Sequence, residues 1–177
     1  MNTLDVIKTR RAVRDWTSQD VSDEMLNQIL EAGRWAPSPL NSQAWTFIVI
    51  RNKETIEKLT PDAQHGSFIS KANVIIVVTI DKNAKVDEWL SHHEQHVLSG
   101  GCAIENMWLV AHDLGLGGCW VTLDKEGTKT LLNLPDGQIL IGSLALGYPA
   151  EAAKPHLETD RKQLSESTFY EFFYNRN

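Results

Sequence analysis

The sequence has few cysteines, no excess of positive charge and no long apolar run. Its two cysteines, Cys102 and Cys119, are too few and too far apart for a disulfide framework or a C-x-x-C metal site, so we expect two reduced, core-side thiols. The formal net charge of −6 argues against nucleic-acid binding, which needs a basic face for the phosphates. No stretch of the sequence approaches the roughly 18 apolar residues of a membrane span, so we expect no membrane-spanning helix.

The N-terminal stretch MNTLDVIKTRRAVRDW carries charges where a signal peptide would need an apolar run of about 7 to 15 residues. Together with the reduced thiols, this predicts a cytoplasmic protein. The length of 177 residues and the lack of a linker or repeat predict a single domain spanning 1–177.

Several common catalytic motifs are also missing. There is no G-x-S-x-G and no P-loop lysine motif, which disfavours hydrolases and nucleotide triphosphatases. The glycines of GLGGCW (115–120) close a helix instead of opening one, so they do not form a dinucleotide fingerprint. We interpret Gly115 as a helix C-cap, and Gly117 and Gly118 as residues that let a flat ligand lie against bare backbone.

The stretch HHEQH (92–96) places histidines three and four residues apart but lacks the H-E-x-x-H spacing and an obvious third ligand. We therefore predict no metal site there. The histidines are interpreted as a polar helix start or as a wall of a substrate pocket.

Hydrophobic spacing predicts alternating helices and strands. Residues 72–80 form a β-branched run without polar alternation, which is typical of a strand buried on both faces. Such alternation of elements predicts a sheet covered by helices on both sides. The expected helices are 2–11, 22–35, 53–60, 93–114 and 126–134, and the expected strands are 45–51, 72–80, 119–123 and 138–148.

Four small residues, 100–103, lie in the middle of the longest predicted helix. They let another element approach closely, at some cost in helix propensity. A helix of the same chain and a helix of a second subunit are both compatible with this pattern.

Three arginines, Arg10, Arg11 and Arg14, cluster near the N-terminus. On a helix Arg10 and Arg14 share a face, and the planar guanidinium suits a phosphate. The alternative is a solvated basic face balanced by Asp5 and Asp15.

The stretch WAPSPLNSQAWTF (35–47) is longer than an ordinary connection of about two to six residues between a helix and a strand. Pro37 and Pro39 stiffen it, and the amides of Asn41 and Gln43 can both donate and accept hydrogen bonds. These features indicate a loop built to hold a ligand or to form one wall of a pocket.

Taken together, the motifs of this chain resemble those of the FMN-dependent nitroreductase family along nearly the whole length. They are R-R-x-x-R, A-P-S-x-x-N-x-Q-x-W before a strand, a small-residue helix with Asn106 that ends in L-G-L-G-G-C-W, then A-L-G-Y-P and a late basic pair. Two positions depart from the family pattern: Ala44, where many relatives have proline, and Ala12, where many have serine or a similar residue.

The resemblance implies an α+β fold with a central mixed sheet and helices on both faces. It further implies a homodimer with FMN at the subunit interface, to which both chains contribute. Residues 150–177, with their aromatic cluster Phe169, Phe172 and Phe173, are expected to form an extension that docks on the dimer.

The resemblance also implies a set of cofactor-binding residues. Arg10 and Arg11, with Ala12 adjacent, match the family's phosphate-binding cluster, and Arg161, helped by Lys162, matches the late basic position. Arg14 matches a basic residue near the pyrimidine edge of the flavin, where its charge would stabilise the reduced ring. The remaining matches are Gln64 beside the ring, the second subunit's loop residues Pro37, Ser38, Pro39 and Asn41, and the backbone stretch Trp120, Val121 and Thr122 facing the ring.

The function implied is an oxidoreductase in which FMN takes hydride from NADH or NADPH and reduces nitroaromatic, quinone-like or other electron-poor acceptors in a ping-pong cycle. No dedicated catalytic side chain is then expected. Flavoproteins of the same fold that carry out reductive dehalogenation, enone reduction or flavin cleavage are alternatives. Two further alternatives are a flavin-binding protein with little turnover and a plain structural domain.

Overall fold

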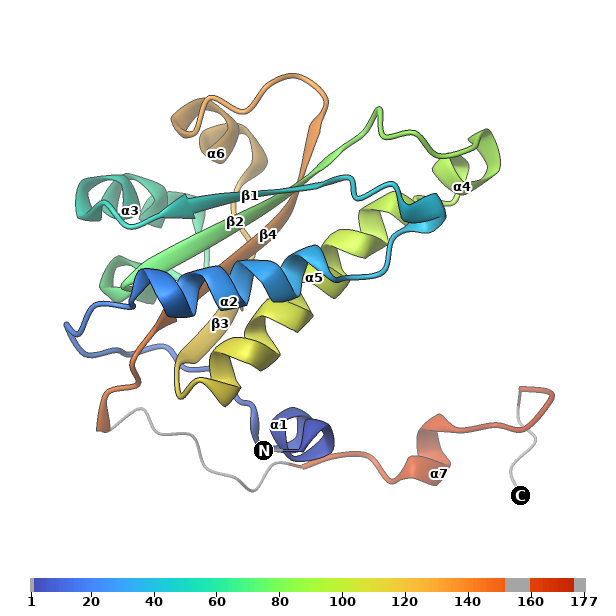
Figure 1. Cartoon of the computed structure of the whole chain (residues 1–177), viewed down its shortest axis with the longest axis horizontal. Coiled ribbons are helices and arrows are strands. Elements are labelled where there is room, and N and C mark those ends of the chain that lie inside the picture. Colours follow the sequence, from blue (N-terminus) through green and yellow to red (C-terminus); the bar gives the residue numbers. More distant parts are fainter. Residues whose placement is uncertain (1, 152–159, 174–177) are drawn as a thin grey trace.

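A computed structural model of the chain describes residues 2–151 and 160–173 (Figure 1). Its centre is a four-stranded sheet in the order β1-β2-β4-β3, and every neighbouring pair of strands is antiparallel. The strands are β1 (Trp45–Ile50), β2 (Val74–Asp81), β3 (Gly117–Val121) and β4 (Gln138–Gly147).

The expectation of a mixed sheet is therefore wrong for these four strands. Within the described residues, parallel pairing is limited to an isolated bridge between Ala12 and Gly118. The α+β class and the helices on both faces are confirmed, because two separate apolar clusters cover the sheet.

Strand β2 lies at the centre of both clusters, as its β-branched run predicted. Ile75 and Val77 point to one face, where they meet Ile56 of α3 (Lys53–Leu59). Ile76 and Val78 point to the opposite face, which is covered by α2 (Asp23–Arg34) and α5 (Gln95–Asp113). Successive side chains of a strand alternate between faces, so a strand without polar alternation can serve two cores.

The other helices are α1 (Thr3–Thr9), α4 (Glu88–His92), α6 (Lys125–Leu131) and α7 (Leu164–Ser167). Helices α1 and α2 each begin at a side-chain N-cap, since the side chains of Asn2 and Ser22 accept hydrogen bonds from the amides of Asp5 and Met25. The helix predicted over 93–114 is α5, which begins at Gln95 because Glu94 adopts a left-handed conformation with φ 52°. The short helix α4, which ends at His92, was not predicted.

Gly100, one of the small residues of α5, serves packing within the chain. A Cβ on Gly100 would lie 2.8 Å from Cγ1 of Ile141, so this glycine brings α5 close to the sheet. Helix α2 meets α5 at Gly33, where a Cβ would lie 2.9 Å from Cγ of Met107. Cys119 is buried as expected, whereas Cys102 is exposed, so the expectation of two core-side thiols is wrong for Cys102.

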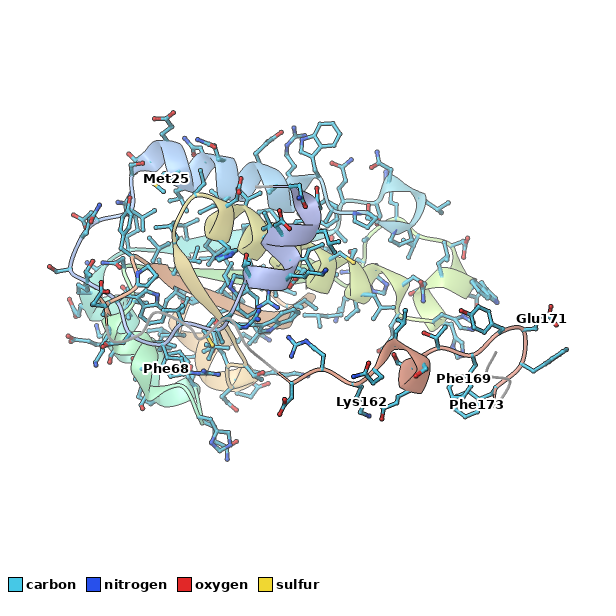
Figure 2. The ribbon with its side chains drawn as sticks, turned by 90° about the horizontal axis from the view of Figure 1, so that it is seen from below. Met25, Phe68, Lys162, Phe169, Glu171 and Phe173 are labelled. Carbon is cyan, nitrogen blue, oxygen red and sulfur yellow. The ribbon has the colours of Figure 1, made fainter. Side chains whose placement is uncertain are left out.

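Residues 160–173 run away from the layered body, as the red end of the ribbon shows (Figure 1). In Figure 2 Lys162, Phe169 and Phe173 lie along this segment, beyond the helices that cover the sheet. Leu164, Phe172 and Phe173 each expose more than 70% of their surface. The rest of the predicted extension, residues 152–159 and 174–177, lies outside the described residues.

Within residues 2–151 and 160–173, no helix is both long and apolar enough to cross a membrane.

Candidate functional site

A cleft of about 810 Å³ opens between the end of β3 and two short 3-10 helices, Thr60–Asp62 and Ser67–Lys71. Five of the residues predicted to bind a cofactor line it: Arg14, Gln64, Trp120, Val121 and Thr122. The remaining lining residues are Pro61, Asp62, His65, Gly66, Phe68, Cys119, Leu123 and Asp124. The structure thus brings together residues that are more than a hundred positions apart in the sequence.

Arg14 reaches the cleft because the chain after α1 is extended and lies along β3. The amide of Val13 donates a hydrogen bond of 2.9 Å to the carbonyl of Gly118, and the indole of Trp16 donates one of 2.9 Å to the carbonyl of Gly117. Val13 is buried, and alternate residues of an extended segment face opposite sides, so Arg14 faces outward. Its guanidinium carbon lies 5.7 Å from the centre of the Phe68 ring.

Two carboxylates on the cleft rim have structural roles. The carbonyl of Asp62 accepts a hydrogen bond of 2.7 Å from the amide of Asp124, and the Asp62 side chain accepts one of 3.1 Å from the hydroxyl of Thr128. The Asp124 side chain caps α6 by accepting a hydrogen bond from the amide of Gly127. Both carboxylates therefore hold α6 against the cleft instead of forming an acid–base pair.

Cys119 forms part of the cleft wall next to Arg14. Burial raises the pKa of its thiol, and the nearby Arg14 charge opposes that shift only in part. The thiol is therefore protonated at neutral pH and donates a weak hydrogen bond to the carbonyl of Trp120.

Gly117 and Gly118 do not leave backbone bare for a ligand, contrary to the prediction. A Cβ on Gly117 would lie 2.7 Å from Cβ of Val13, and one on Gly118 would lie 2.9 Å from Nε1 of Trp108. The space beside both glycines is filled by the protein's own side chains.

Arg10 and Arg14 do not share a helical face, so that prediction is wrong. Helix α1 ends at Thr9, and its C-cap Arg10 is extended with ψ 133°. Arg10 turns toward α5, where its guanidinium lies 4.0 Å from the centre of the Trp108 ring and its Nε lies 3.5 Å from a carboxylate oxygen of Glu105. Arg14 instead faces the cleft.

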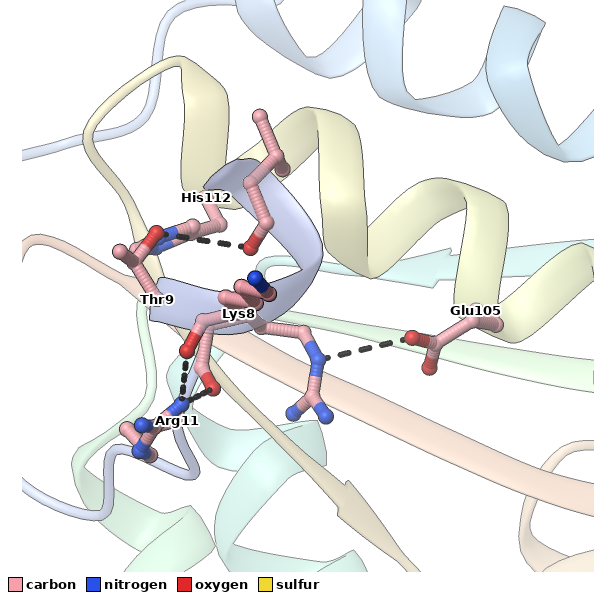
Figure 3. Close-up of polar contacts among 7 residues, drawn as sticks. Lys8, Thr9, Arg11, Glu105 and His112 are labelled. Carbon is pink, nitrogen blue, oxygen red and sulfur yellow. Dashed lines mark hydrogen bonds and ion pairs between the residues drawn. The ribbon is translucent and has the colours of Figure 1, made fainter. Parts of the chain in front are cut away.

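Arg11 folds back on α1, where its Nη1 donates hydrogen bonds of 2.7 Å to the carbonyls of Lys8 and Arg10 (Figure 3). It also lines a separate cavity of about 130 Å³ together with Trp108 and His112. Ala12, between Arg11 and Val13, forms the bridge to Gly118.

The proline-rich loop lies outside the cleft. None of Pro37, Ser38, Pro39 and Asn41 lines it, and the loop runs past the N-terminal end of α5 near α4 (Figure 1). Three loop residues, Leu40, Asn41 and Gln43, have positive φ angles of 52°, 53° and 46°. The hydroxyl of Ser38 accepts a hydrogen bond of 3.1 Å from the amide of Gln43, whose own side chain donates one of 3.4 Å to the carbonyl of Asn41. Gln43 thus braces the loop.

Arg161 and Lys162 lie on the exposed C-terminal segment, and neither lines the cleft.

Sequence reasoning did not identify several residues of this region. His65, Gly66 and Phe68 follow Gln64 closely, and Cys119 precedes Trp120, so proximity to residues already selected would have found them. Trp108 and Glu105, which hold Arg10, carry no such signal because they are in the middle of an ordinary amphipathic helix.

The histidines of the 92–96 stretch are divided between two environments. His96 is buried at the start of α5, whereas the ring of His93 stacks at 4.1 Å on the exposed Trp89 of α4. Among residues 2–151 and 160–173, no group of three or more histidine, cysteine or acidic side chains is arranged to hold a metal ion.

Comparison with known proteins assigns the family. The model of the Nitroreductase family matches residues 7–67 and 60–148, and the chain belongs to this family. A protein of Methanothermobacter thermautotrophicus is 33% identical over 156 residues, which cover 85% of this chain and 79% of the relative. The protein named FMN reductase [NAD(P)H] of Bacillus subtilis is 30% identical over 174 residues, covering 86% of this chain and 70% of the relative.

Solved structures agree with this assignment. A Desulfovibrio desulfuricans protein crystallised in complex with FMN superimposes with a TM-score of 0.81 and is 33% identical; the match covers 98% of both chains. A nitroreductase-like fold is therefore established for this chain.

Proposed function

We propose that the chain is an FMN-dependent oxidoreductase that takes hydride from NADH or NADPH and reduces electron-poor acceptors such as nitroaromatics and quinones. The observation that carries the proposal is the cleft in which Arg14, Gln64 and the 120–122 backbone meet. Family membership and the FMN bound to a 33% identical relative support it. The reduced state expected of both cysteines favours a cytoplasmic setting.

The residues of the cleft fit a flat, polar-edged ring. Its volume of about 810 Å³ lies within the usual range of about 300 to 1,000 Å³ for cofactor and ligand sites. The end of β3 and Phe68 supply flat walls, while Gln64 can donate and accept hydrogen bonds at a ring edge. FMN, when bound, supplies the hydride chemistry. The chain's own residues bind the ring, orient it and adjust its charge.

Arg14 is the cation of the cleft and has an electrostatic role in this proposal. Its positive charge would stabilise the negative charge that a bound flavin gains on reduction. The neighbouring titratable groups do not form a catalytic pair, since Asp62 and Asp124 brace α6 and the Cys119 thiol is protonated. Protons then come from solvent, and the protein needs no dedicated side-chain acid.

Arg10 is proposed to bind the phosphate of the same cofactor. An extended segment of the chain separates it from Arg14, so the two guanidiniums can serve opposite ends of one elongated ligand. Arginine meets phosphate through paired N–H donors, which makes it a better partner than a point charge. Arg11, Ala12, Arg161 and Lys162 are proposed to complete the phosphate site, as the family pattern implies.

A second copy of the chain would complete the site. The loop with Pro37, Ser38, Pro39 and Asn41 is stiff and braced but lies outside its own protomer's cleft, which is the arrangement expected if it serves another protomer. Exposed apolar residues are also available for an interface, including Leu4 and Ile7 of α1 and Leu98 of α5. We therefore propose a homodimer with one flavin site at each end of the interface.

The absorbance spectrum of the purified protein is the first test. Oxidised-flavin bands, with FMN released by heat at about one per chain, are expected. Rapid mixing with NADH and then NADPH should bleach those bands, and a nitroaromatic or quinone should restore them; parallel lines in a double-reciprocal plot would identify the ping-pong order. A colourless protein that takes up no added FMN would refute the proposal, and a yellow protein that neither nicotinamide reduces would refute its redox part.

A further inference from the structure

The guanidinium of Arg10 is held on two sides by α5. One face lies 4.0 Å from the centre of the Trp108 ring, and the Nε side lies 3.5 Å from Oε1 of Glu105. The dashed line to Glu105 in Figure 3 marks this ion pair, which uses Nε and leaves the two terminal nitrogens out. The two Nη nitrogens of Arg10 therefore remain available to a ligand. The indole ring of Trp108 packs against the guanidinium and fixes its plane.

Trp108 is an unusual residue to find in that place. Only 8% of its surface is exposed, and its buried indole Nε1 has no hydrogen-bond partner among the described residues. Burying an indole N–H without a partner costs free energy, and a leucine would fill an apolar position without that cost. What the indole supplies, and leucine cannot, is an electron-rich face for a cation.

The main chain beneath Arg10 is also anchored to α5. The hydroxyl of Thr9 donates a hydrogen bond of 2.6 Å to the carbonyl of Asp5, so its oxygen accepts the 2.9 Å hydrogen bond from Nε2 of His112. This bond joins the end of α1 to α5 one residue before Arg10. Both the backbone and the side chain of Arg10 are thus held by one rigid helix.

We propose that Trp108 is a positioning residue for the phosphate-binding arginine, holding the Arg10 guanidinium in the plane in which its Nη edge meets the cofactor phosphate. This inference rests on the proposed function, since it concerns the FMN phosphate. An arginine that is already ordered loses less conformational freedom when the ligand binds. Trp108 should therefore raise the affinity for the phosphate group and leave the affinity for the flavin ring unchanged. The flavin ring, bound in the cleft lined by Arg14, should not sense Trp108.

Comparison of FMN with riboflavin isolates the contribution of the phosphate. Both ligands share the ring and the ribityl chain, and only FMN carries the phosphate. Flavin fluorescence titrations of the cofactor-free protein give a dissociation constant for each, without any measurement of turnover. For the wild-type protein we expect FMN to bind at least about tenfold more tightly than riboflavin, as charge-assisted hydrogen bonds to a phosphate allow.

Four variants test the role of Trp108. Arg10→Ala should abolish most of the preference for FMN. Trp108→Leu should lower it by about three- to tenfold through the loss of the cation–π contact, with riboflavin affinity unchanged. Trp108→Phe keeps an aromatic face and should retain most of the preference. Met107→Leu, a change at a buried neighbour on α5, serves as the matched control and should leave both affinities unchanged.

Each outcome has a defined meaning. If Trp108→Leu keeps the full preference for FMN, the positioning role is wrong. If the wild-type protein binds both flavins equally, Arg10 does not recognise the phosphate and the inference also fails, although the ring site survives. If it binds neither flavin, the proposed function itself fails.

A fifth variant, Arg10→Lys, tests the inference if circular dichroism and thermal melting show that Trp108→Leu does not fold. Arg10→Lys keeps the charge but has no plane to stack on the indole. We expect it to lose most of the preference for FMN while riboflavin still binds. Full retention of the preference in Arg10→Lys would show that charge alone is sufficient and would overturn the inference.

Discussion

Gly100 of α5 lies against Ile141 of β4 so closely that a Cβ on the glycine would be 2.8 Å from Cγ1 of the isoleucine. The next residue, Gly101, faces Trp120 instead, and its Cβ would meet the indole at an ordinary 3.5 Å. Two adjacent glycines of one helix therefore have opposite tolerance to a methyl group.

Gly100→Ala should destabilise the protein, because overpacking typically costs about 1–3 kcal/mol and outweighs the gain in helix propensity of about 1 kcal/mol. Gly101→Ala is the matched control and should be neutral or slightly stabilising, since it has the same propensity gain without the clash. Chemical denaturation of both variants measures the difference. Equal stabilities would mean that α5 can shift away from the sheet.

Lowering the pH should destabilise the fold through His112. Burial, followed by the charge of Arg10 and then that of Arg11, lowers the pKa of His112, while Asp113 opposes the shift. The unfolded chain therefore binds a proton that the folded protein resists, and the stability contributed by neutral His112 is lost as the pH falls below its ordinary pKa of 6.5.

The variant His112→Gln can still donate a hydrogen bond to Thr9 but cannot gain a charge. Its free energy of unfolding, measured between about pH 7.5 and pH 5, should fall less steeply than that of the wild-type protein. Parallel pH dependences would remove His112 as the cause.

Arg14→Ala should lower the midpoint potential of the bound flavin. Removing a cation from the cleft destabilises the more negatively charged reduced state, and about 1.4 kcal/mol corresponds to roughly 30 mV for a two-electron couple. Arg14→Lys keeps the charge and should retain most of the potential. Potentiometric titration with a reference dye measures the midpoint potential of each variant. An unchanged midpoint potential in Arg14→Ala would exclude the electrostatic role.

Deleting residues 165–177 should reduce the dimer fraction. The described part of this segment exposes Tyr170, Phe172 and Phe173, and the rings of Phe169 and Phe173 lie 4.5 Å apart, as expected of an apolar patch that a partner covers. Light scattering after size exclusion gives the mass. An undiminished dimer would place the contacts of the extension elsewhere.

Cys119 should react slowly with thiol reagents in the folded protein. Its raised pKa leaves little thiolate, and its side chain is buried in the cleft wall. The variant Cys102→Ser leaves Cys119 as the one thiol in the sequence, and its labelling rate should rise sharply in denaturant. Fast labelling before unfolding would show that the cleft wall opens.

Local sequence patterns were sufficient where the interactions are local. The caps Asn2 and Ser22 act on amides three residues away, and the brace from Gln43 to Asn41 lies within one loop. The burial of β2 on both faces also follows from its own residues, because a strand with no polar alternation has no face suited to water.

Prediction failed where a distant segment decides the local conformation. Helical spacing extended α1 through Arg10 and Arg11, but Val13 pairs with Gly118 and draws the chain out of the helix at Thr9. The same pairing fills the space beside Gly117 that the glycine pattern had assigned to a ligand. A competing hydrogen bond from over a hundred residues away has no signature in the local sequence.

The sequence alone therefore determined the α+β class, the main helices and strands, and the residue types suited to a flavin: arginines, amides and a stiff loop. The tertiary structure decided which of them meet. It placed Arg14, Gln64 and the 120–122 backbone in one cleft, turned Arg10 onto Trp108, and left the proline-rich loop and the C-terminal segment outside. The physical reason is that burial and extended-chain hydrogen bonding act between segments far apart in the chain, so only the packed structure reveals their partners.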